Sequence, residues 1–428
     1  EGGPVELAAG EEAGSFVGAI PALTGLWNGE HVATLTPWAG EVEGEAVAAT
    51  YTIALPQPGS QAHWEATDLI GSGIVTALGV MPNGQVMEFG QRMMNGGSRC
   101  YLRRRDPGGA WSQSDVLDVL PGSTCAPVGM KIDAKGSIFL LALRSGQGGS
   151  QWWLGELWSW GASPKNRGLG VQGEVPMAVA VADDGTIAVC GAVPTGLLDE
   201  YDAATWIFRK NDGGEMGVFD YKPEQSKPHE FREIPRDCVF AGTTLVMAGE
   251  AYGRHDGLGE PKRERHFLFE YDLTSKENKW KVGGVEGTLQ SGARALVVDD
   301  QGRYVTAGYV CGDVCQPEAT LRVHDPKGGA LDWYAAIGPL KSLSYGPHDL
   351  AWSPAGYVVV AVGGGKGDEA TFSVRAYKPG SGVPLWTFSR KDNQLFHMAR
   401  AVAVGLFGQV YAGGLGADSY PAVAYIAG

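Results

Sequence analysis

The chain has 428 residues and 65 of them are glycine, roughly twice the usual share, which excludes a mostly helical protein. Hydrophobic residues make up 44% and charged residues 19%, so the chain can bury a large core and is not disordered. The formal net charge of −14 would repel a phosphate backbone, which argues against nucleic acid as a partner. No apolar run approaches the roughly 18 residues of a transmembrane helix, so we expect a protein that does not span a membrane.

One block recurs eight times along the chain: an alternating apolar run, a tight turn ending in glycine, and a second apolar run. Turns of the Asn-Gly and Asp-Gly type supply the positive φ that a short hairpin connection needs, so each block is predicted to be a β-hairpin. The spacing of the turn glycines averages about 54 residues, and a chain of 428 residues holds about eight such repeats. These glycines are Gly29, Gly84, Gly136, Gly185, Gly242, Gly302, Gly356 and Gly408.

A second pair of predicted strands follows the hairpin in the later repeats, and each carries a tryptophan at a similar place: Trp280, Trp333 and Trp386. Four strands per repeat, with glycine in the turns, are typical of a β-propeller. We therefore predict an all-β protein with one domain over residues 1–428, an eight-bladed β-propeller of eight repeats. Seven blades is the alternative, because the first repeat has the weakest pattern.

The two ends of the chain predict how the ring closes. The eighth repeat supplies only three strands before the chain stops at Gly428. The segment GPVELAA, residues 3–9, belongs to no repeat and can supply the fourth strand, which would remove an exposed sheet edge. The last blade is thus predicted to be closed by N- and C-terminal strands.

The six cysteines are even in number and show neither a CxxC pair nor zinc-ligand spacing. Disulfides in an oxidising compartment are the economical interpretation, and six free buried thiols are the alternative. A chain that starts at Glu1 without Met also fits removal of a signal peptide or a lipoprotein leader. The predicted bridges are Cys311–Cys315, Cys100–Cys125 and Cys190–Cys238.

The hairpin blocks RALVVDDQGRYVTAG from Arg294 and RAVAVGLFGQVYAGG from Arg400 resemble the delta-60 and SBBP propeller repeats of large bacterial surface and secreted proteins. The strand-pair block is similar to the tryptophan-docking motif of eight-bladed quinoprotein dehydrogenases, A-x-D-x-x-T-G-x-x-x-W. Its spacing is matched by Ala376, Lys378, Ser381, Gly382 and Trp386, and by Asp325, Gly329 and Trp333. The resemblance implies a propeller fold and a bacterial cell-envelope setting. It implies no active site.

Long insertions between the predicted strands mark one candidate surface, because propeller loops carry most recognition. The largest cover residues 221–235 and 250–265, and the second includes Arg254 and His255. Trp152 and Trp153 in the third blade and the Cys311–Cys315 loop are expected on the same rim. Solvated variable loops without a role are the alternative.

Aligning the first residue of each inner strand predicts a second candidate site. Four consecutive repeats place a basic or titratable side chain there: Arg236, Arg294, His348 and Arg400. Clustered cations at a channel mouth would attract anions in an otherwise acidic protein. Asp237 and Asp349 follow directly, and the alternative is that they neutralise the cations in structural ion pairs.

These patterns favour a monomeric bacterial propeller that is secreted, or attached to the cell surface or outer membrane. We expect it to bind an extracellular protein or glycan through top-face loops of blades three to six. No catalysis, cofactor or metal is expected under this interpretation. The alternative is a carbohydrate-active enzyme resembling a polysaccharide lyase, in which His348 or Tyr345 abstracts a proton while Arg236, Arg294 and Arg400 neutralise a uronate. A purely structural module is a third interpretation.

Overall fold

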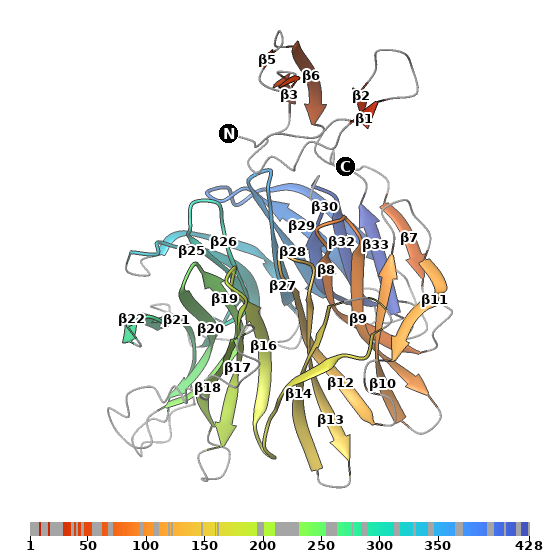
Figure 1. The fold of residues 1–428 in the computed structure, drawn as a ribbon. Coiled ribbons are helices and arrows are strands. Elements are labelled where there is room, and N and C mark those ends of the chain that lie inside the picture. The colour runs from red at the N-terminus through yellow and green to blue at the C-terminus, as the bar shows by residue number, and fades with distance from the viewer. Residues whose placement is uncertain are drawn as a thin grey trace.

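The structure is a computed structural model in which every regular element is a β-strand, which confirms an all-β protein (Figure 1). Before residue 72 it describes short strands alone. Beyond that point it describes residues 72–94, 97–105, 111–118, 120, 123–146, 149–158, 160, 162–194, 201–209, 231–253, 263–275, 277–283, 290–311, 317–327, 331–340, 346–363, 371–391, 398–405, 408–416 and 421–426.

The strands after residue 72 form antiparallel sheets arranged around one axis, as in a β-propeller (Figure 1). The first sheet holds β8 (Gly73–Val80), β9 (Val86–Met94), β10 (Gly97–Arg105) and β11 (Trp111–Asp118). The second holds β12 (Thr124–Ile132), β13 (Ile138–Gly146), β14 (Gly149–Leu157) and β15 (Lys165–Leu169). The third holds β16 (Val175–Val181), β17 (Thr186–Pro194) and β18 (Tyr201–Arg209).

The second half of the propeller is built in the same way. The fourth sheet holds β19 (Phe231–Ala241), β20 (Thr244–Gly253), β21 (Arg263–Asp272) and β22 (Glu277–Gly283). The fifth holds β23 (Gln290–Val298), β24 (Tyr304–Cys311), β25 (Pro317–His324) and β26 (Leu331–Pro339). The sixth has eight strands: β27 (Gly346–Ser353), β28 (Tyr357–Gly363), β29 (Thr371–Tyr377), β30 (Pro384–Lys391), β31 (Met398–Val404), β32 (Val410–Leu415), β33 (Pro421–Ile426) and β7 (Ala62–Ala66).

The prediction of eight blades is wrong, and so is its seven-bladed alternative, because the described strands form six sheets around the channel. Two predicted hairpins, β27–β28 and β31–β32, share the eight-stranded sheet. They are joined at Met398, which pairs with Gly363 of β28 and Thr371 of β29. A count of repeats cannot show that two neighbouring hairpins will merge into one sheet.

The first predicted repeat contributes no hairpin to the propeller. Its glycine, Gly29, begins β3 (Gly29–Leu35), which pairs with β6 (Val47–Ile53) in a separate two-stranded sheet. Two further short pairs lie in this region, β1 (Ala8–Ala9) with β2 (Phe16–Val17) and β4 (Trp38–Ala39) with β5 (Val42–Glu43). All the other predicted turn glycines have positive φ, between 61° and 85°, as a tight hairpin turn requires.

A strand from the N-terminal part of the chain closes the last sheet, but it is not the predicted one. Strand β7 pairs antiparallel with β33, from Ala62 opposite Ile426 to Ala66 opposite Ala422. Residues 8 and 9 of the predicted segment instead form β1. The expected edge protection is present, and a segment about 55 residues further along the chain provides it.

The core lies between neighbouring sheets, because the middle strands of each sheet pack on both of their faces. Strand β28 shows this most clearly, since all its residues are buried. Val358 and Val360 pack into a cluster with Val305 of the fifth sheet, whereas Val359 packs with Val402 of β31. Such strands therefore have near-continuous apolar sequences instead of an alternating pattern.

Two predicted disulfides are confirmed, and each joins adjacent sheets. Cys100 of β10 bonds to Cys125 of β12, and Cys190 of β17 bonds to Cys238 of β19, with Cα–Cα distances of 5.4 and 6.5 Å. Cys311 is also disulfide-bonded. Its predicted partner, Cys315, lies outside the described residues.

We expect that no cysteine can be alkylated in the denatured, unreduced protein, because the described cysteines are all bonded. Reduction should lower the melting temperature, since each bridge constrains the unfolded chain by about 2–4 kcal/mol. Mass spectrometry after alkylation, with and without reductant, measures the first effect, and a thermal melt measures the second. Alkylation of Cys100 or Cys238 before reduction would contradict the pairing.

Candidate functional site

A β-bulge interrupts every strand that lines the central channel. In each one the pairing register with the neighbouring strand shifts at a single residue, which leaves that residue without a cross-strand partner. Bulges re-aim side chains and are common beside binding sites. The bulged residues are Thr76, Val128, Met177, Arg236, Arg294, His348 and Arg400.

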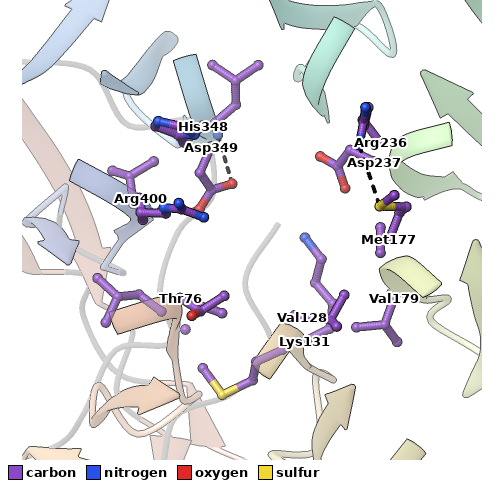
Figure 2. A pocket seen from close by; sticks show the side chains of 18 of the residues that line it. Thr76, Val128, Lys131, Met177, Val179, Arg236, Asp237, His348, Asp349 and Arg400 are labelled. Atoms are coloured by element: carbon purple, nitrogen blue, oxygen red, sulfur yellow. Dashed lines mark hydrogen bonds between the residues drawn. The ribbon is translucent and has the colours of Figure 1, made fainter. Parts of the chain in front are cut away.

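The bulged residues line one cavity of about 250 Å³ at the centre of the propeller. The predicted residues Arg236, Arg294, His348 and Arg400 are thus brought together, on β19, β23, β27 and β31. Figure 2 shows Arg236 on one side of the cavity and His348 with Arg400 on the opposite side. The other bulged residues, Thr76, Val128 and Met177, carry no charge. The four titratable bulged residues therefore come from consecutive inner strands of the ring.

Arg236 has a carboxylate partner, Glu250. Its Nε and Nη2 atoms both donate to Glu250 Oε2, at 3.1 and 2.7 Å. The Glu250 side chain is only 3% exposed, so this pair is well shielded from water. Sequence reasoning missed Glu250, which lies in β20 next to the bulge. Arg236 consequently contributes less positive charge to the cavity than its position alone indicates.

Arg294 and Arg400 lie close enough to influence each other. Burial, and next the positive charge of Arg294, lower the pKa of Arg400. Arg294 also stacks over the Tyr309 ring, with its Cζ atom 5.3 Å from the ring centre. The Arg400 Nε atom donates to the sulfur of Met398 at 3.1 Å. Two neighbouring guanidinium groups beside one cavity favour the binding of a negatively charged group there.

His348 lies between these two cations and is neutral near physiological pH. Burial, and next the charges of Arg400 and Arg294, lower its pKa to about 3. Its Nε2 atom is buried and has no hydrogen-bond partner among the described residues. The ring lies against Gly363, where a Cβ atom would come within 2.7 Å of Nε2. Glycine at this position therefore leaves the space that the imidazole occupies.

Asp237 and Asp349 do not neutralise the arginines in the described contacts. Asp237 accepts hydrogen bonds from the amides of Cys238 and Leu296, at 2.8 and 2.7 Å. Asp349 accepts the equivalent pair from Leu350 and Val402, at 2.8 and 2.9 Å. Each carboxylate thus ties its own strand to the next inner strand. Burial raises the pKa of Asp237, and it raises that of Asp349 to about 7.

Lys131 is a further charged residue of the cavity that sequence reasoning did not identify. It extends from β12 into the space between Asp237 and Asp349 (Figure 2). Its positive charge opposes the rise in pKa of both carboxyls. The cavity therefore contains the bulged cations and a second charged group, formed by Lys131, Asp237 and Asp349. The sequence did offer one signal for Lys131, because it is a charged residue in a predicted inner strand, three residues after Val128.

The structure does not add the other predicted binding residues to this site. Trp152 and Trp153 are 2% and 4% exposed and pack in two different core clusters. The Trp152 Nε1 atom donates to Glu174 Oε2 at 2.7 Å, and its ring lies 5.2 Å from that of Trp206. Arg254, His255 and Tyr345 lie outside the described residues.

The described residues contain no group of three or more His, Cys, Asp or Glu side chains able to hold a metal ion. In the same part of the chain, no helix has the length and apolar character that crossing a bilayer demands.

No family model and no curated protein match the sequence. Solved structures do match the fold. An ulvan lyase of polysaccharide lyase family PL25, bound to -[GlcA(1-4)Rha3S]-, is 11% identical with a TM-score of 0.55, and the match covers 85% of this chain and 96% of that one. An α-L-arabinanase from Penicillium chrysogenum, complexed with arabinobiose, is 11% identical with a TM-score of 0.47, covering 86% and 98%. The likeness to the lyase shows a shared β-propeller fold.

Proposed function

We propose that the protein binds an acidic glycan at the channel cavity, with Arg294 and Arg400 as the groups that recognise a uronate carboxylate. The observation that carries this proposal is that Arg294 and Arg400 line one cavity of about 250 Å³, where burial and then the charge of Arg294 lower the pKa of Arg400. Arginine forks bind carboxylates by charge-assisted hydrogen bonds. Asp237 and Asp349 accept hydrogen bonds from backbone amides, and both Arg294 and Arg400 line the cavity.

The proposal places the protein outside the cell. Disulfides persist in oxidising compartments, and acidic glycans are extracellular polymers in many organisms. The repeat resemblance to bacterial surface proteins supports the same setting. Secretion and cell-surface attachment are two forms of this proposal, and the partner is a glycan in both.

We expect an Arg400→Ala variant to bind oligogalacturonate about ten- to hundredfold more weakly than the parent, since a charge-assisted contact contributes about 1.5–3 kcal/mol. Arg400 makes no salt bridge to a described residue, so the melting temperature should stay nearly unchanged. Isothermal titration calorimetry measures the affinity, with a methyl-esterified oligomer as the neutral ligand.

Lys135→Ala is the matched control, because Lys135 is an exposed cation in the hairpin turn after β12, away from the cavity. It should leave the affinity unchanged. Equal binding by Arg400→Ala and the parent, or no binding of any uronate polymer by the parent, would show that the cavity does not recognise acidic glycans.

A second candidate function is lysis of the same class of polymer, which the neutral His348 beside Arg294 and Arg400 favours. A neutral imidazole can accept a proton next to a carboxylate held by arginine. A pKa of about 3 makes it a weak base, however, which ranks binding above catalysis. Ultraviolet absorbance of an unsaturated uronate product, present in the parent and lost in His348→Ala, would decide for lysis.

A further inference from the structure

A buried guanidinium lies in the interface between the fourth and fifth sheets. Arg322 of β25 is 2% exposed, and its Nε, Nη1 and Nη2 atoms are buried with no hydrogen-bond partner among the described residues. Burial lowers its pKa to about 10, so the group stays charged at neutral pH. A buried charge that lacks a partner costs several kcal/mol. A buried group of this kind usually has an ion or an ordered water molecule as its hydrogen-bond partner.

Two arginines occupy the equivalent position in other sheets and allow a comparison. Each of the three arginines lies on the third strand of its sheet. The second-strand residue paired with each arginine is also paired with a leucine of the inner strand, so the three positions are equivalent. The pairs of leucine and arginine are Leu78 with Arg103, Leu296 with Arg322, and Leu350 with Arg375. Arg103 lies opposite Glu88 and interacts with its charge. Arg375 donates to the carbonyl of Ile337 and to Ser373 Oγ. Arg322 lies opposite Thr306 and has neither kind of partner.

The side chains around Arg322 are suited to an anion. The rings of His266 and His324 stack with centres 5.4 Å apart, and His266 Nε2 lies 3.4 Å from Thr306 Oγ1. Burial, and next the charge of Arg322, lower the pKa of His266 well below its usual value, so it adds no positive charge of its own. Glu270, a carboxylate of the same interface, accepts a hydrogen bond from Tyr304 Oη at 3.1 Å.

We propose that Arg322 binds a chloride ion between β21 and β25, with the hydroxyl of Thr306 as a second donor. His266, Thr306 and His324 are each at most 2% exposed, which favours a monatomic anion over a larger one. The site is separate from the channel cavity, and chloride there stabilises the packing of two sheets.

Chloride should raise the melting temperature of the parent by at least about 3 °C over sodium fluoride at equal ionic strength, with a saturating dependence on concentration. The Arg322→Met variant should lose this response. Without chloride it should be at least as stable as the parent, because an apolar residue replaces an uncompensated charge. Bromide, a heavier halide, should give an anomalous diffraction peak beside Arg322.

Arg375→Met and Arg400→Ala are the controls, and both should keep the chloride response. The first removes an arginine that already has protein partners, and the second excludes halide binding in the channel. An equal response in Arg322→Met and the parent, or no difference between chloride and fluoride, would overturn the proposal in favour of water or an unpaired charge. If Arg322→Met does not fold, a parent crystal without a bromide peak at this site overturns it.

Discussion

Starting the chain at residue 67 should lower the melting temperature by at least about 10 °C and cause aggregation, because this removes β7. The strand pairs with β33 along its whole length, from Ala62 to Ala66. Without it, β33 has an unpaired edge that can template association with another copy. Because β7 joins the first part of the chain to the last sheet, its loss also removes the closure of the ring. Thermal melts and light scattering measure the two effects.

Deletion of residues 1–10 is the control for this experiment. It removes β1, which pairs with β2 and not with the last sheet. We expect the melting temperature of this variant to stay within about 2 °C of the parent value. An equally large loss of stability in the chain that starts at residue 11, which keeps β7, would show that the predicted N-terminal segment closes the ring instead.

Local features of the fold were predictable because they depend on short sequence patterns. A glycine at the end of a tight turn needs positive φ, and Gly185 and Gly408 have it, as do their counterparts in the other propeller hairpins. The even number of cysteines predicted disulfides, and the structure confirms the pairing of Cys100 with Cys125, which the number alone does not determine. The choice of β7 over the segment 3–9, and the merging of two hairpins at Met398, depend on contacts between distant residues and could not be predicted.

The candidate site was predicted in part for the same reason. Aligning the repeats identified Arg294, His348 and Arg400 as one set, since equivalent positions of a propeller face one channel. The bulges that turn these side chains inward arise from the register between two strands, which one strand's sequence does not show. Asp237 was expected to pair with arginine, and its partner is the amide of Leu296, 59 residues away.

Trp152 and Trp153 illustrate the limit of reading a recognition surface from composition. Exposed aromatic residues often mark binding sites, and this pair was expected on a rim. Both lie within β14, where successive side chains point to opposite faces of the sheet. Because sheets pack on both faces in a propeller, each tryptophan enters a different core. Adjacent tryptophans in a middle strand therefore indicate packing between sheets.

The affinity of the channel for a uronate should rise as the pH falls from about 8 to about 5. His348 has a pKa of about 3 in the free protein, because it is buried beside Arg400 and Arg294. A bound carboxylate would offset those charges and raise this pKa, so binding takes up a proton. Affinity then rises by up to about tenfold per pH unit below the pKa of the complex. The uronate itself stays ionised above a pH of about 5.

Asp349 acts in the same direction, since its pKa of about 7 means that it loses its charge as the pH falls through neutrality. Its repulsion of a bound carboxylate then disappears, while the charges of Lys131, Arg294 and Arg400 persist. Calorimetry in two buffers with different ionisation enthalpies counts the protons taken up. His348→Gln should reduce that count and flatten the pH dependence, and Lys135→Ala should not. An affinity that is constant, or that falls toward pH 5 in the parent, would show that the ligand does not lie beside His348.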